Sequence, residues 1–221
     1  MADNPILTLD NVTFGYAGCA ALFEGLCFAL GKGEQVGLYG PNGCGKTTLL
    51  RLVMGLETSQ GGRVLFHGVP VTGGKAWRQL RCNVGLVLQN SDDQLFSPTV
   101  LEDVAFGPLN LGLKKKEARA RAMETLESMG MEAFADRSAH RLSGGEKKMV
   151  SIASVLAMRP EALLLDEPSA FLDDASRDRI IGILEQHAVA RLVVSHDKDF
   201  LERTTTSLVS IMEGRLTAFT P

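Results

Sequence analysis

A glycine-rich segment near the N-terminus carries the residue types that hold a phosphate chain. Residues 40–47 read GPNGCGKT and fit the pattern G-x-x-x-x-G-K-[ST] without a mismatch. Gly43 and Gly45 have no Cβ, so backbone N–H groups can approach the β-phosphate. We expect Lys46 to reach the β- and γ-phosphates and the Thr47 hydroxyl to bind Mg²⁺. The expected nucleotide-binding residues of this loop are Asn42, Gly43, Cys44, Gly45, Lys46, Thr47 and Thr48.

The segments on either side of this loop support that interpretation. An apolar run, Gln35–Tyr39, precedes it, and a helix-like run from Thr48 to Met54 follows it. A buried strand, a glycine turn and a helix start would direct the positive end of the helix at the phosphates.

Two adjacent acids end a second apolar run. Residues 163–165 are all leucine, and Asp166 and Glu167 follow them. The ends of strands in parallel sheets are where ligands bind, and neighbouring side chains on a strand point to opposite sides. We therefore expect different roles, with Asp166 binding Mg²⁺ and Glu167 orienting or deprotonating a water molecule.

The segment Leu142–Glu146 reads LSGGE and opens a predicted helix. Ser143 and Glu146 have the spacing of a capping box, which explains part of the motif. Gly144 and Gly145 weaken a first helical turn, so capping does not explain them. They are consistent with a phosphate that approaches bare backbone at the helix start.

Two further side chains have both a structural and a functional interpretation. His196 follows the run Arg191–Ser195 and is either a structural histidine or a donor to the γ-phosphate. Tyr16 lies between Gly15 and Gly18 and is either a structural aromatic or a ring that stacks on adenine.

Alternating strands and helices predict an α/β protein with a parallel-sheet core. Short strands near the N-terminus and after the first helix predict a small antiparallel β subdomain. Residues of about 90–160 are predicted to form a helical subdomain inserted in the α/β core. The whole chain, 1–221, is predicted to be one domain. The supporting segments are strands at Ile6–Phe14, Cys27–Leu30, Gly62–Phe66, Asn83–Leu88, Ala162–Leu165 and Arg191–Val194, and helices at Lys114–Met129 and Ser143–Met158.

Composition excludes several classes of protein. With 221 residues, 45% apolar residues and 22% charged residues, the chain can bury a sizeable core. A net charge of -3 disfavours a dedicated nucleic-acid binder. We expect no signal peptide, and no apolar stretch reaches the roughly 20 residues that cross a bilayer. The spacing of the cysteines disfavours zinc or a disulfide framework; they are Cys19, Cys27, Cys44 and Cys82.

Taken in order, these motifs resemble the ATP-binding subunits of ABC transporters, over essentially the whole chain. The resemblance implies a P-loop NTPase (RecA-like) fold that binds ATP and Mg²⁺. Residues 40–47 match the Walker A loop and residues 163–167 the Walker B strand with its catalytic glutamate. Residues 142–146 match the signature LSGGQ, with Glu146 in place of Gln. Gln89 matches the Q-loop glutamine, which contacts Mg²⁺ and water.

The remaining motifs complete the implied site. Residues 169–173 match the D-loop, which adds Asp173 to the nucleotide-binding set; His196 matches the switch histidine and Tyr16 the adenine-stacking aromatic. In this family two subunits pair head to tail around ATP. The resemblance therefore implies that the signature residues Ser143, Gly144 and Gly145 bind the nucleotide of the second subunit, which is either an identical chain or a paralogue.

The stretch from Gln89 to Pro108 is similar to that of energy-coupling-factor transporters, and closest to the ATPases of cobalt and nickel importers. This resemblance implies an integral membrane scaffold, a substrate-binding membrane component and a place at the cytoplasmic face of the cell membrane. Asp92 and Asp93 are candidates for scaffold contact or form an ordinary acidic turn. A biotin or other vitamin importer is the alternative. A soluble ABC protein acting on ribosomes or DNA, and an exporter, fit the sequence less well.

The chain departs from the family pattern at three places. Phe171 stands where the D-loop usually has Gly, and Met149 where an Arg is common. The sequence also ends soon after residues 213–215, so we expect a dimer that depends more on ATP and on the scaffold.

Overall fold

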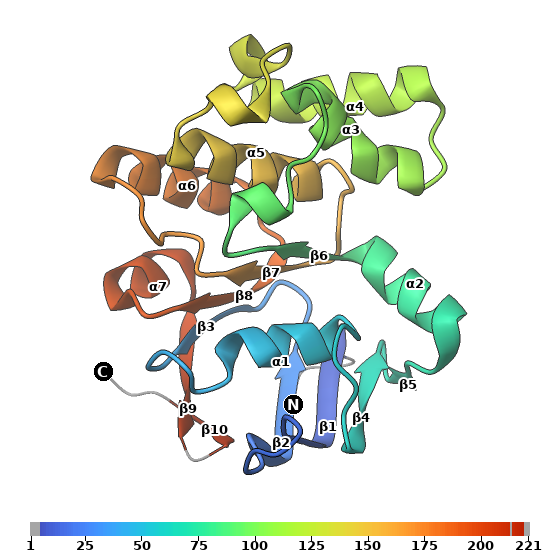
Figure 1. Ribbon diagram of the computed structural model, residues 1–221, viewed down its shortest axis with the longest axis vertical. Coiled ribbons are helices and arrows are strands. Elements are labelled where there is room, and N and C mark those ends of the chain that lie inside the picture. The colour runs from blue at the N-terminus through green and yellow to red at the C-terminus, as the bar shows by residue number, and fades with distance from the viewer. Residues whose placement is uncertain (1–4, 213, 219–221) are drawn as a thin grey trace.

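A six-stranded sheet, which is parallel except at one edge, forms the centre of the computed structural model, which describes residues 5–212 and 214–218 (Figure 1). Its strand order is β10-β9-β3-β8-β7-β6, and β10 at the edge runs antiparallel to β9. The strands are β3 (Gln35–Tyr39), β6 (Val84–Val87), β7 (Ala162–Asp166), β8 (Ala190–Ser195), β9 (Ser207–Met212) and β10 (Arg215–Ala218). The prediction of an α/β fold with a parallel sheet is confirmed.

The antiparallel sheet is also present, with the strand order β2-β1-β4-β5. Its strands are β1 (Leu7–Phe14), β2 (Phe23–Leu30), β4 (Gly61–Phe66) and β5 (Val69–Pro70). The sequence pattern predicted β2 only from Cys27, whereas the strand starts at Phe23. Helix α1 (Lys46–Val53) lies between the two sheets, because its leucines share one core with residues of β1 and β8.

The other helices cover the parallel sheet and build a layer above it (Figure 1). They are α2 (Gly73–Asn83), α3 (Val100–Asn110), α4 (Lys115–Ser128), α5 (Gly144–Leu156), α6 (Asp174–Gln186) and α7 (Lys198–Thr204), with short 3-10 turns η1 (Ser91–Asp93), η2 (Glu132–Phe134) and η3 (Ala139–Arg141). Within the described residues, every helix is too short or too polar to span a bilayer.

Strand β7 separates two hydrophobic cores. All five of its residues are buried, as in a central parallel strand that is covered on both faces. Leu163 and Leu165 belong to the core under α3–α6, and Leu164 belongs to the core that contains α1. The division follows from the two-residue repeat of a strand.

The contact between β6 and α5 gives a test of this packing. A Cβ at Gly85 would lie 2.0 Å from Cγ1 of Val155, a β-branched side chain with little rotamer freedom. Gly85→Ala should therefore lower the free energy of unfolding by about 1–3 kcal/mol through overpacking. Urea denaturation measures this change.

Gly74→Ala in α2 is the matched control. A Cβ at Gly74 meets none of the described atoms within 4 Å, and Ala is the better helix former by up to about 1 kcal/mol. Equal unfolding midpoints for the two variants would contradict the close approach of β6 and α5.

Candidate functional site

The glycine-rich loop connects β3 to α1 and ends in two left-handed residues. Gly43 has a φ of 83° and Gly45, the N-cap of α1, has a φ of 103°. A Cβ at Gly45 would also lie 2.7 Å from the Phe23 ring. Glycine is therefore required at this helix start, where the first backbone N–H groups of α1 offer an anion site.

Lys46 is buried and its ammonium lies inside the loop. Nζ donates to the carbonyl oxygen of Gly40 at 2.7 Å and to that of Pro41 at 3.1 Å. A carboxylate oxygen of Glu167 lies 3.6 Å from the same nitrogen. The positive charge is thus held against the loop and one acid, in a position to bind phosphate oxygens.

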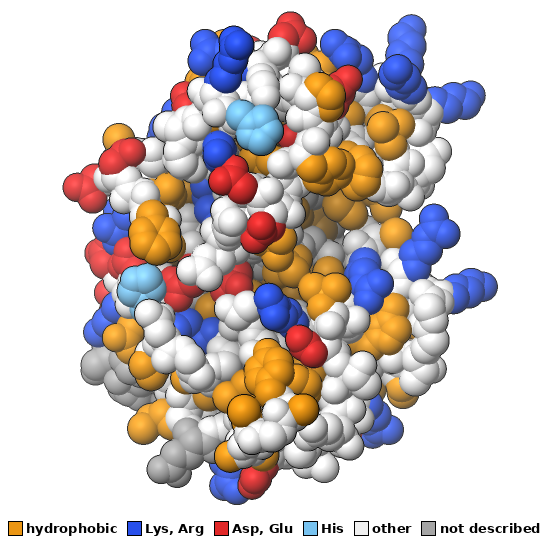
Figure 2. Space-filling view, viewed as in Figure 1, with side chains coloured by type: hydrophobic (Ala, Val, Ile, Leu, Met, Phe, Trp, Pro, Cys, Tyr) orange, Lys and Arg blue, Asp and Glu red, His pale blue; other side chains and the backbone are white. Residues whose placement is uncertain are grey.

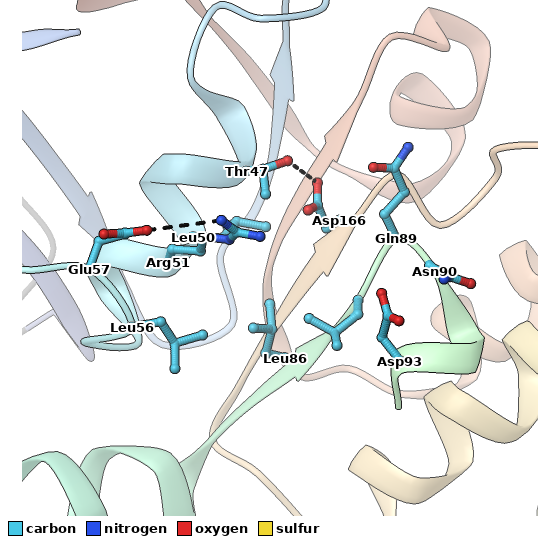
Figure 3. Close-up of a pocket in the computed structure, with 11 residues that line it drawn as sticks. Thr47, Leu50, Arg51, Leu56, Glu57, Leu86, Gln89, Asn90, Asp93 and Asp166 are labelled. Carbon is cyan, nitrogen blue, oxygen red and sulfur yellow. Dashed lines mark hydrogen bonds and ion pairs between the residues drawn. The ribbon is translucent and has the colours of Figure 1, made fainter. Parts of the chain in front are cut away.

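Thr47 in the first turn of α1 and Asp166 at the end of β7 are in direct contact (Figure 3). The Thr47 hydroxyl donates to Oδ1 of Asp166 at 3.1 Å. Burial, with a smaller contribution from Glu167, raises the pKa of Asp166, although the Thr47 hydrogen bond and two lysines oppose this shift. A buried carboxylate whose charge is disfavoured gains from a bound cation, and these hard oxygen donors suit Mg²⁺.

The described residues contain no group of three or more His, Cys, Asp or Glu side chains that could enclose a metal ion. A site with few protein ligands suits Mg²⁺, which usually keeps water and takes oxygens from substrate phosphates. Thr47 and Asp166 therefore fit the ion that the sequence implies.

Glu167 follows β7 and lies between a lysine and a histidine. Its backbone has a φ of 45°, a left-handed value for a non-glycine residue. Its Oε2 lies 2.8 Å from Nδ1 of His196 and accepts from the Ser195 hydroxyl at 3.2 Å. The Glu167 side chain is 7% exposed, whereas the His196 side chain is 57% exposed. The sequence pattern did not single out Ser195, although its place at the end of β8 beside His196 was a usable signal.

Residues of the glycine-rich loop, together with Glu167 and His196, line a cavity of about 600 Å³, and Asp166 is absent from its described lining. Its lining consists of Tyr16, Leu22, Asn42, Gly43, Gly45, Lys46, Thr47, Thr48, Gln89, Glu167, Ala170, Phe171 and His196. Leu22 was not foreseen, because it lies between two strands with no motif around it. Cys44 is outside this lining and packs against the core that contains α1.

Tyr16 lines this cavity, and its contacts are consistent both with a structural role and with a ring that stacks on adenine. Its hydroxyl lies 3.0 Å from the Thr48 hydroxyl, and its ring packs edge-on against Phe14 at 5.0 Å. These contacts fix the ring, which is 43% exposed and lines the cavity. A fixed and exposed ring offers a surface on which a base can stack.

Gln89 lines this cavity and also a neighbouring one of about 410 Å³ (Figure 3). The second cavity extends from Thr47 and Asp166 past Leu56 to Asp93. Hydrophobic side chains gather beside the hollow between α3 and α2 (Figure 2). Phe106 of α3 and Phe96 of the loop before it are exposed, and their rings meet edge-on at 4.8 Å.

The signature residues lie apart from these two cavities. Ser143 accepts from the backbone N–H of Glu146 at 3.3 Å, and its own N–H donates to Glu146 Oε2 at 2.7 Å. The Ser143 hydroxyl donates to the same carboxylate oxygen at 2.8 Å, and the Ser143 N–H together with this hydroxyl lowers the pKa of Glu146. The structure thus contains the capping box that the sequence predicted. Ser143, Gly144 and Gly145 are absent from the described linings of both cavities.

Asp173 has a local structural partner. Its carboxylate accepts from the backbone N–H of Ser176 at 2.8 Å and caps α6. A Cβ at Gly145 would lie 2.2 Å from the Ser176 hydroxyl oxygen, so the starts of α5 and α6 are in close contact. Asp173 therefore lies beside the signature residues, and it too is absent from the described linings.

Phe171 is the residue that departs most from the expected pattern. It is 98% exposed and has a φ of 61°, a conformation that glycine adopts without strain. The D-loop backbone thus keeps a glycine-like shape although it carries a large aromatic side chain.

The position of the Lys46 ammonium leads to a direct test. Lys46→Ala should weaken ATP binding by about 10- to 100-fold, because charge-assisted hydrogen bonds contribute about 1.5–3 kcal/mol. Titration with a fluorescent ATP analogue measures the change. The exposed Lys32→Ala is the control, and equal affinities for both variants would refute the phosphate role of Lys46.

Comparison with known proteins identifies the family. The model of the ABC transporter family matches residues 23–170. A putative ABC transporter ATP-binding protein of Nitratidesulfovibrio vulgaris is 50% identical over 96% of this chain and 78% of the relative. The energy-coupling factor transporter ATP-binding protein EcfA of Methanocaldococcus jannaschii is 41% identical over 96% and 77%. The cobalt import ATP-binding protein CbiO of Rhodobacter capsulatus is 41% identical over 97% and 78%.

A solved structure shows the same fold. The structure of cbiO1 from Clostridium perfringens, described as part of the ABC transporter complex cbiONQ, superposes with a TM-score of 0.86 at 32% identity. The match covers 97% of this chain and 88% of the other. The extent of the family match and the identities to these relatives show that the chain belongs to the ABC transporter ATP-binding family and is an ATPase.

Proposed function

We propose that this ATPase powers an energy-coupling-factor importer, most specifically one for cobalt or nickel ions. The observation that carries the catalytic part is the convergence of Lys46, Glu167 and His196 on one cavity. The importer part is supported by the resemblance of the segment from Gln89 to Pro108 and by relatives named as energy-coupling-factor and cobalt import proteins.

In the proposed site, the chain holds the nucleotide through the loop between β3 and α1. Residues 42–48 surround the phosphates, with Lys46 as the cation, and Tyr16 stacks on the adenine. Thr47, Asp166 and Gln89 would hold Mg²⁺, which would neutralise negative charge on the phosphates. Gln89 also orients the water beside the γ-phosphate.

Glu167 is the proposed base for hydrolysis. Its carboxylate accepts hydrogen bonds from Ser195 and from the backbone N–H of His196, so its position is fixed before a substrate arrives. It takes a proton from the attacking water, or orients that water. His196 is half exposed at the cavity rim, where its ring bonds Glu167 through Nδ1 and can direct its other nitrogen to the γ-phosphate.

The separation of the signature motif from the cavity supports a two-subunit mechanism. Ser143, Gly144, Gly145 and Asp173 lie outside the described linings of the cavity that contains Lys46. In a head-to-tail dimer, these residues would cover the nucleotide of the second subunit. ATP would then join the two subunits, and its hydrolysis would release them.

The second cavity is the proposed docking site for the membrane scaffold, at the cytoplasmic face of the membrane. Asp93 lines this cavity, and Phe96 is exposed on the adjacent loop, 65% accessible. A helix with cationic and apolar side chains would complement them. Asp92 is less suited, because Lys147 forms an ion pair with it at 2.6 Å and lowers the pKa of its carboxyl group.

The transported solute would be selected by a separate membrane component, so the metal would not contact this chain. Biotin or another vitamin is the alternative cargo, since the names of the energy-coupling-factor relatives state no solute. The mechanism of the ATPase would be the same in both cases.

Removing the proposed base should separate binding from hydrolysis. Glu167→Gln should lower kcat by at least about 100-fold while ATP binding persists, because the amide keeps the shape but accepts no proton. A steady-state phosphate-release assay measures turnover. Size-exclusion chromatography with ATP measures the dimer, which should persist because the bound ATP is not hydrolysed. Glu161→Gln, a change of an exposed glutamate that pairs with His67, is the control. Normal turnover of the Glu167 variant would remove this residue as the base.

The docking proposal has its own test. Asp93→Arg should release the chain from its native membrane partners and leave ATP affinity unchanged, because it reverses a charge in the proposed groove. Co-purification from membranes followed by mass spectrometry identifies the partners, and Asp136→Arg provides an exposed acidic control. Retention of the same partners by both variants would contradict the assignment, and recovery of ribosomal or DNA-repair proteins by the wild-type chain would overturn transport.

A further inference from the structure

A lysine of the signature helix holds the backbone of the loop that carries Gln89. Lys148 lies in α5 and is 3% exposed. Its Nζ donates to the carbonyl oxygen of Leu88 at 2.8 Å and to that of Gln89 at 2.7 Å. About 60 residues separate the lysine from these carbonyls in the sequence, so the contact joins two distant segments.

This ammonium is costly to bury, and the loop carbonyls offset part of the cost. Burial lowers the pKa of Lys148 to about 8, although the charge of Asp166 favours the protonated form. Hydrogen bonds to a charged donor are stronger than those between neutral groups. Any displacement of the loop from α5 would leave a buried ammonium and two carbonyls without these partners, which strongly opposes it.

A second set of contacts ties the same loop to the same helix. Gln94 accepts from the backbone N–H of Leu88 at 3.1 Å. Its amide nitrogen donates to the carbonyl oxygen of Ser151 at 2.8 Å and to the Ser154 hydroxyl at 3.0 Å. The two ends of the segment 88–94 are therefore attached to α5, while the Gln89 side chain extends to the two cavities.

We propose that Lys148 is a positioning residue that makes Gln89 move as one body with the signature helix. The inference rests on the role of Gln89 in the proposed function. Residues 143–145 open the helix that Lys148 belongs to. A shift of this helix toward the nucleotide of a second subunit would therefore carry Gln89 relative to Thr47 and Asp166. The signature motif would therefore reach the second nucleotide in the same movement that places Gln89 beside the catalytic water.

A double-mutant cycle tests this coupling in the full chain. Lys148→Met keeps the aliphatic length and removes the three donors, and it is combined with Gln89→Ala. We expect each single change to lower kcat by at least about tenfold with KM for MgATP within about threefold, because water placement is affected and phosphate binding is not. If Lys148 acts through Gln89, the double variant turns over no more slowly than Gln89→Ala.

A control and a second variant keep the test decisive. Lys147→Met alters the neighbouring lysine, whose ammonium pairs with exposed Asp92, and should retain kcat close to wild type. Lys148→Gln retains an amide donor and should restore part of kcat; it replaces Lys148→Met in the cycle if the latter does not fold. Counting active sites by nucleotide titration separates a loss of folded protein from a loss of kcat.

The outcomes distinguish the inference from the function on which it rests. A double variant slowed by the product of the two single effects would overturn the positioning role and leave Gln89 in the site. An unchanged kcat for Gln89→Ala would overturn the role of Gln89 itself, and the inference with it. An effect of Lys148→Met on KM alone would also overturn the inference.

Discussion

The parallel register of β3, β8 and β7 is the constraint on which the site depends. Tyr39 pairs with Ser195, and Val194 pairs with Asp166, so the three strands end at the same edge. The chain leaves these ends as the glycine-rich loop, as His196 and as Glu167. Residues from three separate segments thus meet because carboxyl ends of neighbouring parallel strands coincide. A shift of one strand by a residue would separate Lys46 from Glu167 and Glu167 from His196.

Four charged side chains in and around the site are buried. Lys46, Asp166, Glu167 and Lys148 are each less than a tenth exposed. Each has an oxygen or nitrogen partner within the chain, which limits the cost of its burial. These partners come from loops and from the first turn of α1 rather than from the middle of strands, so the charges stay close to the surface where a nucleotide can reach them. The arrangement strengthens electrostatic interactions without burying any charge in an apolar core.

The sequence allowed prediction of those parts of the fold whose signal is local. The loop at residues 40–47 and the apolar runs of β3, β7 and β8 could be located from spacing alone, and their convergence follows from the geometry of a parallel sheet. The start of β2 was missed because Glu24 and Gly25 interrupt its alternation, and α2 because it opens with two glycines. The contacts of Lys148 with residues 88 and 89 could not be foreseen, since they depend on how two distant segments pack. The proposed roles of the signature residues and of Asp173 stay predictions. These residues lie outside the lining of the cavity that contains Lys46, and their proposed ligand is the nucleotide of a second subunit.

The alternation of leucines on β7 has a consequence for how the chain loses its structure. Leu163 and Leu165 complete one core and Leu164 completes the other, so a single strand is shared by both. Melting the helices above the sheet would expose one face of β7 and weaken the strand on which the opposite core is built. The two cores are therefore thermodynamically linked, and unfolding should proceed as one cooperative transition rather than leave a folded half behind.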